Sequence, residues 1–316
     1  MKKILVIEYS QTGQLTAVMD RLLGPLLESG DEFIVHRESL QTIPAAPFPW
    51  PFWQFLDTFP ETVTGESPPL QPLHVDEASE FDLIILAYPV WFLSPPPAVT
   101  AFLKSDHASR LLRERPVVTV TACRNMWVMA QERIKTLLLA AGARHCDHVA
   151  LVDQGSALAS FITTPRWMLT GRKNAFWKFP AAGVSASQIH ASRRFGLALR
   201  QALSTDQEKL ARPMLHGLAA CTVDTGLASS ERVGIRSFRL WAAVLRALGR
   251  PGTPLRRVAL AFYLFFLIVL ILTVVPLSLL LKVALRPFFK QRLTTLKNHL
   301  EKPSGSDRSR LPLFDE

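Results

Sequence analysis

Short runs of almost uninterrupted apolar residues constrain the fold of this chain more than any other feature of its sequence. Three such runs lie at 3–7 (KILVI), 82–88 (DLIILAY) and 117–122 (VVTVTA). Strands of a parallel sheet have this composition because helices cover both of their faces. Weaker patterns predict two further strands, at 32–38 and 148–152. The sequence therefore predicts a five-stranded parallel sheet.

Helical patterns fill most of the chain between these strands. Apolar residues recur three and four positions apart from 15 to 27, where Gly24-Pro25 predicts a kink in the last turn. Further helices are expected over 97–113, 127–142 and about 186–203. Because strands and helices alternate, the predicted fold is a doubly wound α/β sheet.

Two long stretches interrupt the alternation. Residues 41–72 are rich in proline and contain the aromatic cluster PAAPFPWPFWQFLDTFP, which leaves room for at most a short helix. Residues 153–183 separate the fifth strand from the last helix and include Trp167, Phe176 and Trp177. We predict two long loops here. Loops of this length serve as lids or binding loops, or pack over sheet edges, and the sequence leaves both roles open.

The stretch YSQTGQLT, residues 9–16, joins the first strand to the first helix. Ligands of doubly wound sheets bind at this edge, where the helix N-terminus presents free N–H groups and a positive dipole end. Ser10 and Thr12 add hydroxyl groups, and Gly13 lets the backbone approach a ligand closely. One capping serine or threonine explains one hydroxyl but not the pair with a glycine. The stretch therefore suits a phosphate monoester.

The same stretch resembles the phosphate loop of flavodoxin-like proteins that bind FMN. That loop follows the pattern Ser/Thr-x-Thr-Gly-x-Thr, which Ser10, Thr12 and Gly13 match, whereas Leu15 stands in place of the last threonine. The resemblance covers residues 1–203 and implies a flavodoxin-like fold with FMN as cofactor. Nothing in the sequence resembles the three-glycine fingerprint of dinucleotide-binding proteins.

Two further loops carry this resemblance. AYPVWFLSPPP follows the third strand and resembles the loop whose backbone and aromatic side chain flank the isoalloxazine ring. TACRNMW follows the fourth strand and resembles the loop along the ring edge and the ribityl chain. The cofactor-binding residues that the resemblance implies are Ser10, Gln11, Thr12, Gly13, Gln14, Leu15, Pro89, Val90, Trp91, Phe92, Thr121, Ala122, Cys123, Arg124 and Asn125. No catalytic residue is identified; Tyr88, Arg124 and His36 are candidate bases only through their proximity to strand ends.

Residues 258–281 contain no charged side chain. As a helix this segment would span ~36 Å, enough to cross a hydrocarbon core of ~30 Å. The formal net charge is +10, and lysines and arginines cluster on both sides of the segment, which favours anionic lipid over nucleic acid as the partner. Because basic residues are as numerous after the segment as before it, the sequence does not choose between a single span and a re-entrant hairpin.

The sequence thus divides into an FMN-binding domain, a linker and a membrane-associated C-terminal region. The domain covers 1–203 and the linker 204–234. Residues 235–250 are predicted to form a basic amphipathic helix on the membrane surface, and 258–281 the embedded segment. The rest, 282–316, is predicted to form a basic juxtamembrane helix and a disordered tail.

Cysteine and histidine offer no metal site. Cys123, Cys146 and Cys221 have neither disulfide nor metal spacing. His145 and His148 lie three apart in a predicted strand, so their side chains are expected on opposite faces. The scattered cysteines, and an N-terminal apolar run too short for a signal peptide, predict a reducing compartment. We therefore expect the protein at the cytoplasmic face of the bacterial inner membrane.

Two stretches, MKKILVIEYSQTGQLT and PFPWPFWQFLDTFPETV, resemble bacterial dialkylresorcinol-condensing enzymes. This resemblance implies a flavodoxin-like aromatase that acts beside a ketosynthase and an acyl carrier protein. Its substrate would be a carboxylated cyclohexanedione with two alkyl arms, which partitions into lipid at ~0.8 kcal/mol per methylene. An NAD(P)H:quinone reductase of the flavodoxin type and a membrane-anchored flavodoxin-like electron carrier are the alternatives.

Overall fold

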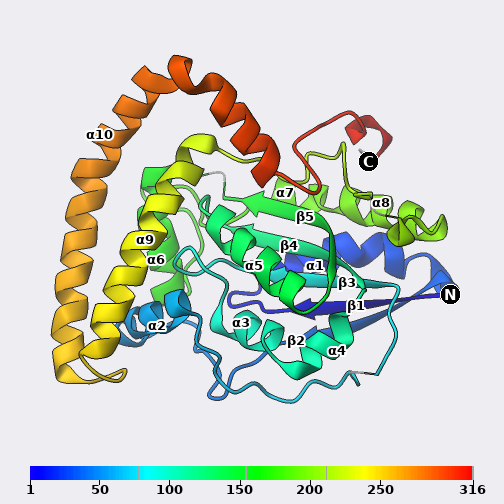
Figure 1. Ribbon diagram of the computed structural model, residues 1–316, viewed down its shortest axis with the longest axis horizontal. Helices are drawn as coiled ribbons and strands as arrows, with labels where there is room; N and C mark the ends of the chain where they lie inside the picture. The colour runs from blue at the N-terminus through cyan, green and yellow to red at the C-terminus, as the bar shows by residue number, and fades with distance from the viewer. Residues whose placement is uncertain (77, 154, 211, 315–316) are drawn as a thin grey trace.

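A computed structural model describes residues 1–76, 78–153, 155–210 and 212–314, with side chains except at 157–158 and 274–290 (Figure 1). Its strands are β1 (Lys2–Glu8), β2 (Phe33–Ser39), β3 (Leu83–Tyr88), β4 (Pro116–Cys123) and β5 (Arg144–Val152). They form one parallel sheet in the order β2-β1-β3-β4-β5. This strand order is that of flavodoxin-like doubly wound folds, so the predicted fold class is confirmed.

Helices cover both faces of the sheet (Figure 1). Fully buried Leu22, from α1 (Gln14–Leu27), and Phe195, from α8 (Arg193–Ser204), lie in the apolar layer on one face. Phe102, from α3 (Pro97–Leu103), and Ile134, from α5 (Val128–Ala140), lie in the layer on the other. Gly196 permits the close approach of α8 to α1, because a Cβ there would lie 1.8 Å from the Leu22 carbonyl oxygen. The helices are α1 (Gln14–Leu27), α2 (Phe52–Thr64), α3 (Pro97–Leu103), α4 (Asp106–Leu112), α5 (Val128–Ala140), α6 (Ala157–Thr170), α7 (Ala186–Ala191), α8 (Arg193–Ser204), α9 (Thr225–Ala247) and α10 (Pro254–Leu300).

Both stretches predicted as long loops contain a helix of full length, α2 and α6. Each helix includes a proline, Pro60 or Pro165, at a cost of about 3 kcal/mol in a helix interior. In α2, buried Phe59 and Val63 lie one turn apart and pack against α9 and α10. Burial of that face offsets the cost of the proline, which is why the prediction from local composition is wrong here.

The predicted helix over 97–113 is two helices. Ser105 separates them, and its hydroxyl accepts a hydrogen bond from Ala108 N at 3.1 Å, which caps α4. The predicted helix at about 186–203 is likewise divided, into α7 and α8, at Ser192. By contrast α1 continues through Pro25 to Leu27.

The region predicted as a linker is part of the folded domain. Met214 and Leu215 are buried, and their backbone N–H groups donate to the carboxylate of Asp147 at 2.7 and 3.1 Å. Ala150 N donates to Ala220 O at 2.8 Å, so this segment runs beside β5. Buried apolar residues within a polar stretch hold it in place, and the first ten or so residues of α9 also lie inside the predicted linker.

The tail predicted to be disordered is ordered through residue 314. Buried Ser304 donates to Asp147 Oδ1 at 2.7 Å and accepts from His148 N at 2.7 Å. Glu301, also buried, accepts from Val223 N at 2.9 Å. A polar composition predicts disorder when the sequence shows no binding partner for it. Here the polar side chains form hydrogen bonds with the backbone of β5 and of the neighbouring segment at Val223.

His145 and His148 lie on the same face of β5, contrary to the prediction. Pairing with β4 shifts after the Val117–His145 pair, and Val118 lies opposite Asp147. The extra residue forms a bulge, which reverses the alternation of side chains after His145. As a result, the Thr119 hydroxyl lies 2.9 Å from His145 Nε2 and 2.9 Å from His148 Nδ1. Burial lowers the pKa of His145 to about 4.

Helices α9 and α10 form an antiparallel hairpin at the side of the domain that carries α2 and α6 (Figure 1). The apolar face of α9, which was expected to lie on a membrane, is covered by protein instead: Ile235 and Leu245 are buried against α2 and α10. Residues 254–273 of α10 have a mean hydropathy of 2.3, and 17% of that stretch is buried. By length and composition this helix could be membrane-associated.

Candidate functional site

The carboxyl ends of β1, β3 and β4 meet at one edge of the sheet (Figure 1). The three loops singled out from the sequence, 9–16, 87–97 and 121–127, follow these strands. Strand order reverses between β1 and β3, so this edge is a topological switch point, where doubly wound folds bind ligands. The fold therefore brings all three loops to the expected crevice.

The loop after β1 ends at a helix terminus whose N-cap residue has no side chain. Gly13 is the N-cap of α1 with φ of 75°, and no side chain caps the helix at that position. A Cβ added to Gly13 would meet no atom within 4 Å, so space is open in front of the loop. The Ser10 hydroxyl lies over the first turn, 3.4 Å from Thr16 N, which donates to it. Free N–H groups and a positive dipole end suit a bound anion.

Two glutamines of this loop hold its surroundings. Gln11 Nε2 donates to Pro47 O at 2.8 Å, and Gln11 Oε1 accepts from the Tyr9 hydroxyl at 2.6 Å. Gln14 forms a pair of hydrogen bonds with the backbone of Val184, at 3.0 and 3.2 Å. The side chains of Gln11 and Gln14 therefore fix neighbouring segments at the crevice. Leu15 is buried in the core below α1.

The loop after β3 is a tight turn with unusual backbone geometry. Trp91 and Ser94 exchange two backbone hydrogen bonds, of 2.9 and 2.8 Å. The residues between them, Phe92 and Leu93, have φ of 48° and 58°, in the left-handed region that bulky residues rarely adopt. Such backbone costs of order 1–3 kcal/mol per residue and persists where packing determines it. Pro89 and Val90, at the start of the loop, are half-buried.

The aromatic side chains of this loop point into the protein. Trp91 is 8% exposed, and its ring lies edge-on to Tyr9 at 5.7 Å and to Trp50 at 5.6 Å. Phe92 packs on Phe55, with ring centroids 5.2 Å apart. Trp91 and Phe92 thus form an apolar wall beside the crevice, and their predicted contact with a flavin ring stays a prediction.

The loop after β4 has a backbone held by hydrogen bonds and contains one partly buried cation, Arg124. The Thr121 hydroxyl is buried and donates to Tyr88 O at 2.8 Å, Ala122 is buried, and Cys123 Sγ donates to Leu151 O. Arg124 and Asn125 are half-buried where the loop turns away from β4. These residues place the backbone of the loop at the sheet edge.

The Arg124 guanidinium stacks on the Phe161 ring, with 3.8 Å from Cζ to the ring centroid. Its Nε is buried and has no hydrogen-bond partner among the described residues. Burial lowers the pKa of Arg124 to about 10, against the opposing influence of Asp153. A charged donor without a partner at a ligand-binding edge is a candidate contact for an electron-rich group.

Asp153 ties the segment after β5 to the same edge. Its two carboxylate oxygens accept from Gly155 N and from Gly183 N, both at 2.7 Å. The segment between them includes α6 and returns to Gln14 of the first loop through Val184. The stretch 153–183, predicted as a loop, is therefore held at both ends next to the first loop.

Two of the three candidate bases, Tyr88 and His36, lie within strands of the sheet. The Tyr88 hydroxyl is buried and donates to Gln131 Oε1, on the α5 side of the sheet, and burial raises its pKa. His36 lies in the middle of β2, paired with Leu5 and edge-on to Phe81. Of the three candidates, only Arg124 lies past the end of a strand, because Tyr88 is the last residue of β3 and His36 lies within β2.

Glu231 lies in the predicted linker and was not among the predicted site residues. Its carboxylate lies at the N-terminus of α5, where Oε2 accepts from Met129 N at 2.9 Å, while Oε1 is buried without a partner among the described residues. Burial raises the pKa of Glu231 to about 8, although backbone N–H groups of the helix end oppose the shift. Glu231 is the single carboxylate of a helix that otherwise carries only basic charges, and this is the signal that could have identified it.

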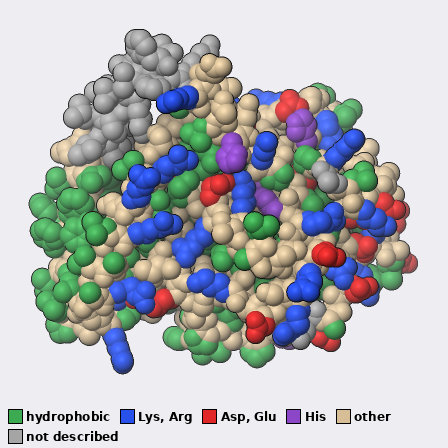
Figure 2. Space-filling view, viewed as in Figure 1, with side chains coloured by type: hydrophobic (Ala, Val, Ile, Leu, Met, Phe, Trp, Pro, Cys, Tyr) green, Lys and Arg blue, Asp and Glu red, His purple; other side chains and the backbone are tan. Residues whose placement is uncertain are grey.

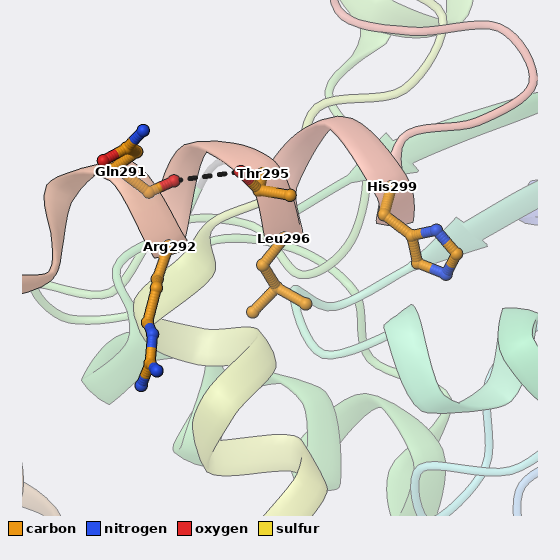
Figure 3. Close-up of a pocket in the computed structure, with 5 residues that line it drawn as sticks. All are labelled: Gln291, Arg292, Thr295, Leu296 and His299. Carbon is orange, nitrogen blue, oxygen red and sulfur yellow. Dashed lines mark hydrogen bonds between the residues drawn. The ribbon is translucent and has the colours of Figure 1, made fainter.

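A separate cavity of about 580 Å³ lies along the last turns of α10 (Figure 3). All five of its lining residues belong to that helix, so it is distinct from the crevice at the sheet edge. The side chains drawn in Figure 3 are Gln291, Arg292, Thr295, Leu296 and His299. Thr295 donates to the Gln291 carbonyl oxygen at 3.1 Å.

Neither a protein-family model nor a curated protein matches this chain. A flavoprotein from Lactobacillus acidophilus NCFM, solved in complex with FMN, is 16% identical and covers 48% of this chain and 93% of its own, with a TM-score of 0.38. General stress protein 14 from Treponema denticola, solved in complex with FMN, is 12% identical, covers 64% and 99%, and has a TM-score of 0.33. A Fusobacterium nucleatum flavodoxin bound to flavin mononucleotide is 10% identical, covers 65% and 99%, and has a TM-score of 0.33. Matches of this strength describe a similar chain path and assign no function.

Proposed function

We propose that this protein is an FMN-dependent oxidoreductase that acts on a lipid-like substrate at a membrane surface. The observation that carries the proposal is the N-terminus of α1, which begins at left-handed Gly13, at the switch point between β1 and β3. Flavodoxin-like folds bind FMN at this position. The solved flavoproteins named above include FMN complexes, which accords with the same cofactor.

The residues at the crevice fit the chemical groups of FMN. Backbone N–H groups of α1 and the hydroxyls of Ser10 and Thr12 would hold the phosphate. Pro89, Val90 and the loop after β4 would flank the ring, and Arg124 supplies an unpartnered donor beside it. When bound, FMN supplies an acceptor or donor of a hydride or of single electrons.

A cluster of aromatic rings connects the crevice wall with the hairpin, which favours a hydrophobic substrate. Phe92, in the loop after β3, contacts Phe59 of α2 with ring centroids 5.3 Å apart. Phe59 stacks on Tyr263 of α10 at 4.8 Å, and Tyr263 contacts Trp241 of α9 at 5.1 Å. The sheet edge at which we propose FMN to bind therefore adjoins the apolar hairpin, which supports a substrate delivered from lipid.

The specific reaction that we propose is oxidative aromatisation of an alkylated, carboxylated cyclohexanedione to a dialkylresorcinol. Bound FMN would serve as the acceptor of a hydride from one ring carbon, and the carboxylate on the neighbouring carbon would leave as carbon dioxide. The electron pair of the broken C–C bond then completes the aromatic ring, so no further oxidant enters this step. A quinone or dioxygen takes the two electrons from the cofactor afterwards. A ketosynthase and an acyl carrier protein are the proposed partners, at the cytoplasmic face of the inner membrane.

Flavin spectroscopy of the purified protein tests the cofactor. We expect a yellow protein, or one that binds added FMN, and at least about tenfold weaker binding for the Ser10→Ala/Thr12→Ala variant, because two phosphate contacts of ~1 kcal/mol each are lost. A colourless protein that FMN does not reconstitute would contradict the proposal.

Anaerobic reduction of the bound flavin tests the reaction. Bleaching by a carboxylated dialkyl-cyclohexanedione without nicotinamide, with release of carbon dioxide, supports the aromatase. Bleaching by NAD(P)H followed by reoxidation with a quinone supports a quinone reductase instead. A flavin that neither reductant bleaches, but that exchanges electrons with a protein donor, indicates a carrier.

A further inference from the structure

The outer face of α10 carries a continuous apolar stripe. Its members recur three and four positions apart, so they share one side of the helix over ~27 Å. Each is between 42% and 71% exposed, whereas Leu260 and Tyr263 on the inner side are buried against α2 and α9. The stripe consists of Leu255, Val258, Phe262, Phe265, Val269 and Leu272. Exposed aromatic and aliphatic side chains in such a row mark an interaction surface.

Basic side chains lie beside the stripe. Figure 2 shows hydrophobic side chains gathered at the edge of the molecule formed by α10, with Lys and Arg side chains beside them over α9. The exposed arginines of this region are Arg232, Arg236, Arg239, Arg246, Arg250 and Arg257, of which Arg246 pairs with Glu66. An apolar row bordered by arginine complements an anionic lipid surface, where each basic residue contributes about 1 kcal/mol. A second copy of this chain would bring the same arginines together, which disfavours a dimer on this face.

Both ends of α10 are fixed to the same domain. At its start, Arg256 donates to Asp57 Oδ1 at 2.9 Å and to Glu61 Oε2 at 2.6 Å, both on α2. Just past its end, Glu301 and Ser304 are bonded to Val223 and to Asp147 of β5. Between these points α10 bends and returns toward the domain (Figure 1). A helix that crosses a bilayer must place its ends about 30 Å apart on opposite sides, which these attachments oppose.

We propose that α10 docks in the plane of an anionic bilayer and does not cross it. The stripe enters one leaflet, the flanking arginines bind lipid phosphates, and everything from β1 to the C-terminal segment stays on one side. The inference deepens the membrane association within the proposed function and rests on that part of it alone. The sequence leaves open a single span and a re-entrant hairpin, and the inference replaces both with a helix that lies in one leaflet.

Vesicle flotation of the full chain tests the docking surface. We expect co-flotation with vesicles of phosphatidylglycerol and phosphatidylcholine, weaker with phosphatidylcholine alone, and weaker at high salt. Phe262→Glu/Phe265→Glu should reduce the bound fraction by at least about tenfold, since burial of each phenylalanine contributes ~1.5–3 kcal/mol. Leu139→Glu, at a residue 78% exposed on α5, is the matched control and should float like the parent. Equal flotation of both variants would overturn the proposal. So would a parent protein that forms a stable dimer and does not bind vesicles, if Phe262→Glu/Phe265→Glu abolishes that dimer.

Terminal tags test the topology without any core substitution. N- and C-terminal epitopes should both be digested by protease in inside-out membrane vesicles and both survive in intact spheroplasts, and alkaline carbonate should release the protein. Opposite accessibility of the two tags, or resistance to carbonate, would show a spanning helix and overturn the inference. FMN binding is measured on the same preparations. A parent that docks but binds no FMN would refute the cofactor and leave the docking intact, and the reverse result would do the opposite.

Discussion

Arg256 and Asp57 stand 199 positions apart in the sequence, yet Arg256 Nε donates to Asp57 Oδ1 at 2.9 Å. Arg256 is fully buried, and its second partner, Glu61, accepts from it through both carboxylate oxygens. Asp57 also accepts from Gly252 N, in the turn of the hairpin, at 2.9 Å. One arginine therefore attaches the start of α10 to α2, a helix that composition alone did not predict.

Arg256→Met should lower the free energy of unfolding by about 3–5 kcal/mol, because it leaves a buried carboxylate without its partner. Urea denaturation followed by tryptophan fluorescence measures the loss. Arg257→Met, at the exposed neighbour, is the matched control and should change stability by about 0.5 kcal/mol or less. Equal stability of the two variants would contradict a role for the buried pair.

Glu231→Gln should weaken the pH dependence of stability. The pKa of Glu231 is raised from 4.5 to about 8, chiefly by burial, so the folded protein keeps a proton that the unfolded chain loses. The free energy of unfolding therefore falls as the pH rises from about 4.5 to 8, by about 3–5 kcal/mol for this group. Glutamine keeps the acceptor for Met129 N and removes the titration.

Denaturation at pH 5 and pH 8 measures the effect as the difference between parent and Glu231→Gln. The comparison is needed because Asp147, with a pKa raised by burial to about 6, also titrates in this range. Glu32→Gln, at an exposed residue just before β2, is the control and should leave the parent profile unchanged. A Glu231→Gln profile parallel to that of the parent would show that the carboxyl does not titrate in this window.

Gly13→Ala should weaken FMN binding by roughly tenfold or more, since a methyl group would stand where the phosphate approaches the loop. Gly30→Ala is a matched control: Gly30 has φ of 65° against 75° at Gly13, and a Cβ at either position meets no atom within 4 Å. Both substitutions strain the backbone alike, but Gly30 lies before β2, away from the crevice. Fluorescence titration with FMN distinguishes them, and equal affinities would place the phosphate elsewhere.

Arg124→Met should lower the midpoint potential of the bound flavin, because a cation near the ring favours the electron-rich reduced state. Equilibrium reduction against a reference dye measures the potential independently of turnover. Arg166→Met removes another arginine stacked on an aromatic ring, Phe176, at 4.1 Å outside the three loops, and should leave the potential unchanged. An unchanged potential in Arg124→Met would remove Arg124 from the ring environment.

Local patterns were enough to predict the sheet. Leu83–Tyr88 is buried along its whole length, and such a run specifies a two-sided strand wherever the rest of the chain lies. The phosphate loop could also be predicted from local sequence, because its pattern, a glycine and two hydroxyl residues between a strand and a helix, spans only a few residues. The positions of the three loops follow from strand order, which right-handed crossovers restrict to few choices.

The remaining structure depends on partners far along the chain. The helix at Phe52–Thr64 forms despite its proline because Phe59 packs on Tyr263, and the tail is ordered because Ser304 meets Asp147. His145 and His148 share a face because of one unpaired residue in β5. In each case the free energy by which the local sequence favours the predicted conformation is small, about 1–3 kcal/mol. The free energy gained from long-range burial or hydrogen bonding exceeds it.

The amino-acid sequence by itself determined the α/β class, the edge at which the three loops meet and the apolar character of α10, since each follows from side chains close together in the chain. Only the tertiary structure decided that Trp91 and Phe92 turn inward, that α9 buries its apolar face and that both ends of α10 return to one domain. Those outcomes depend on which surfaces meet, because a side chain's environment is set by contacts between segments that the chain itself keeps far apart.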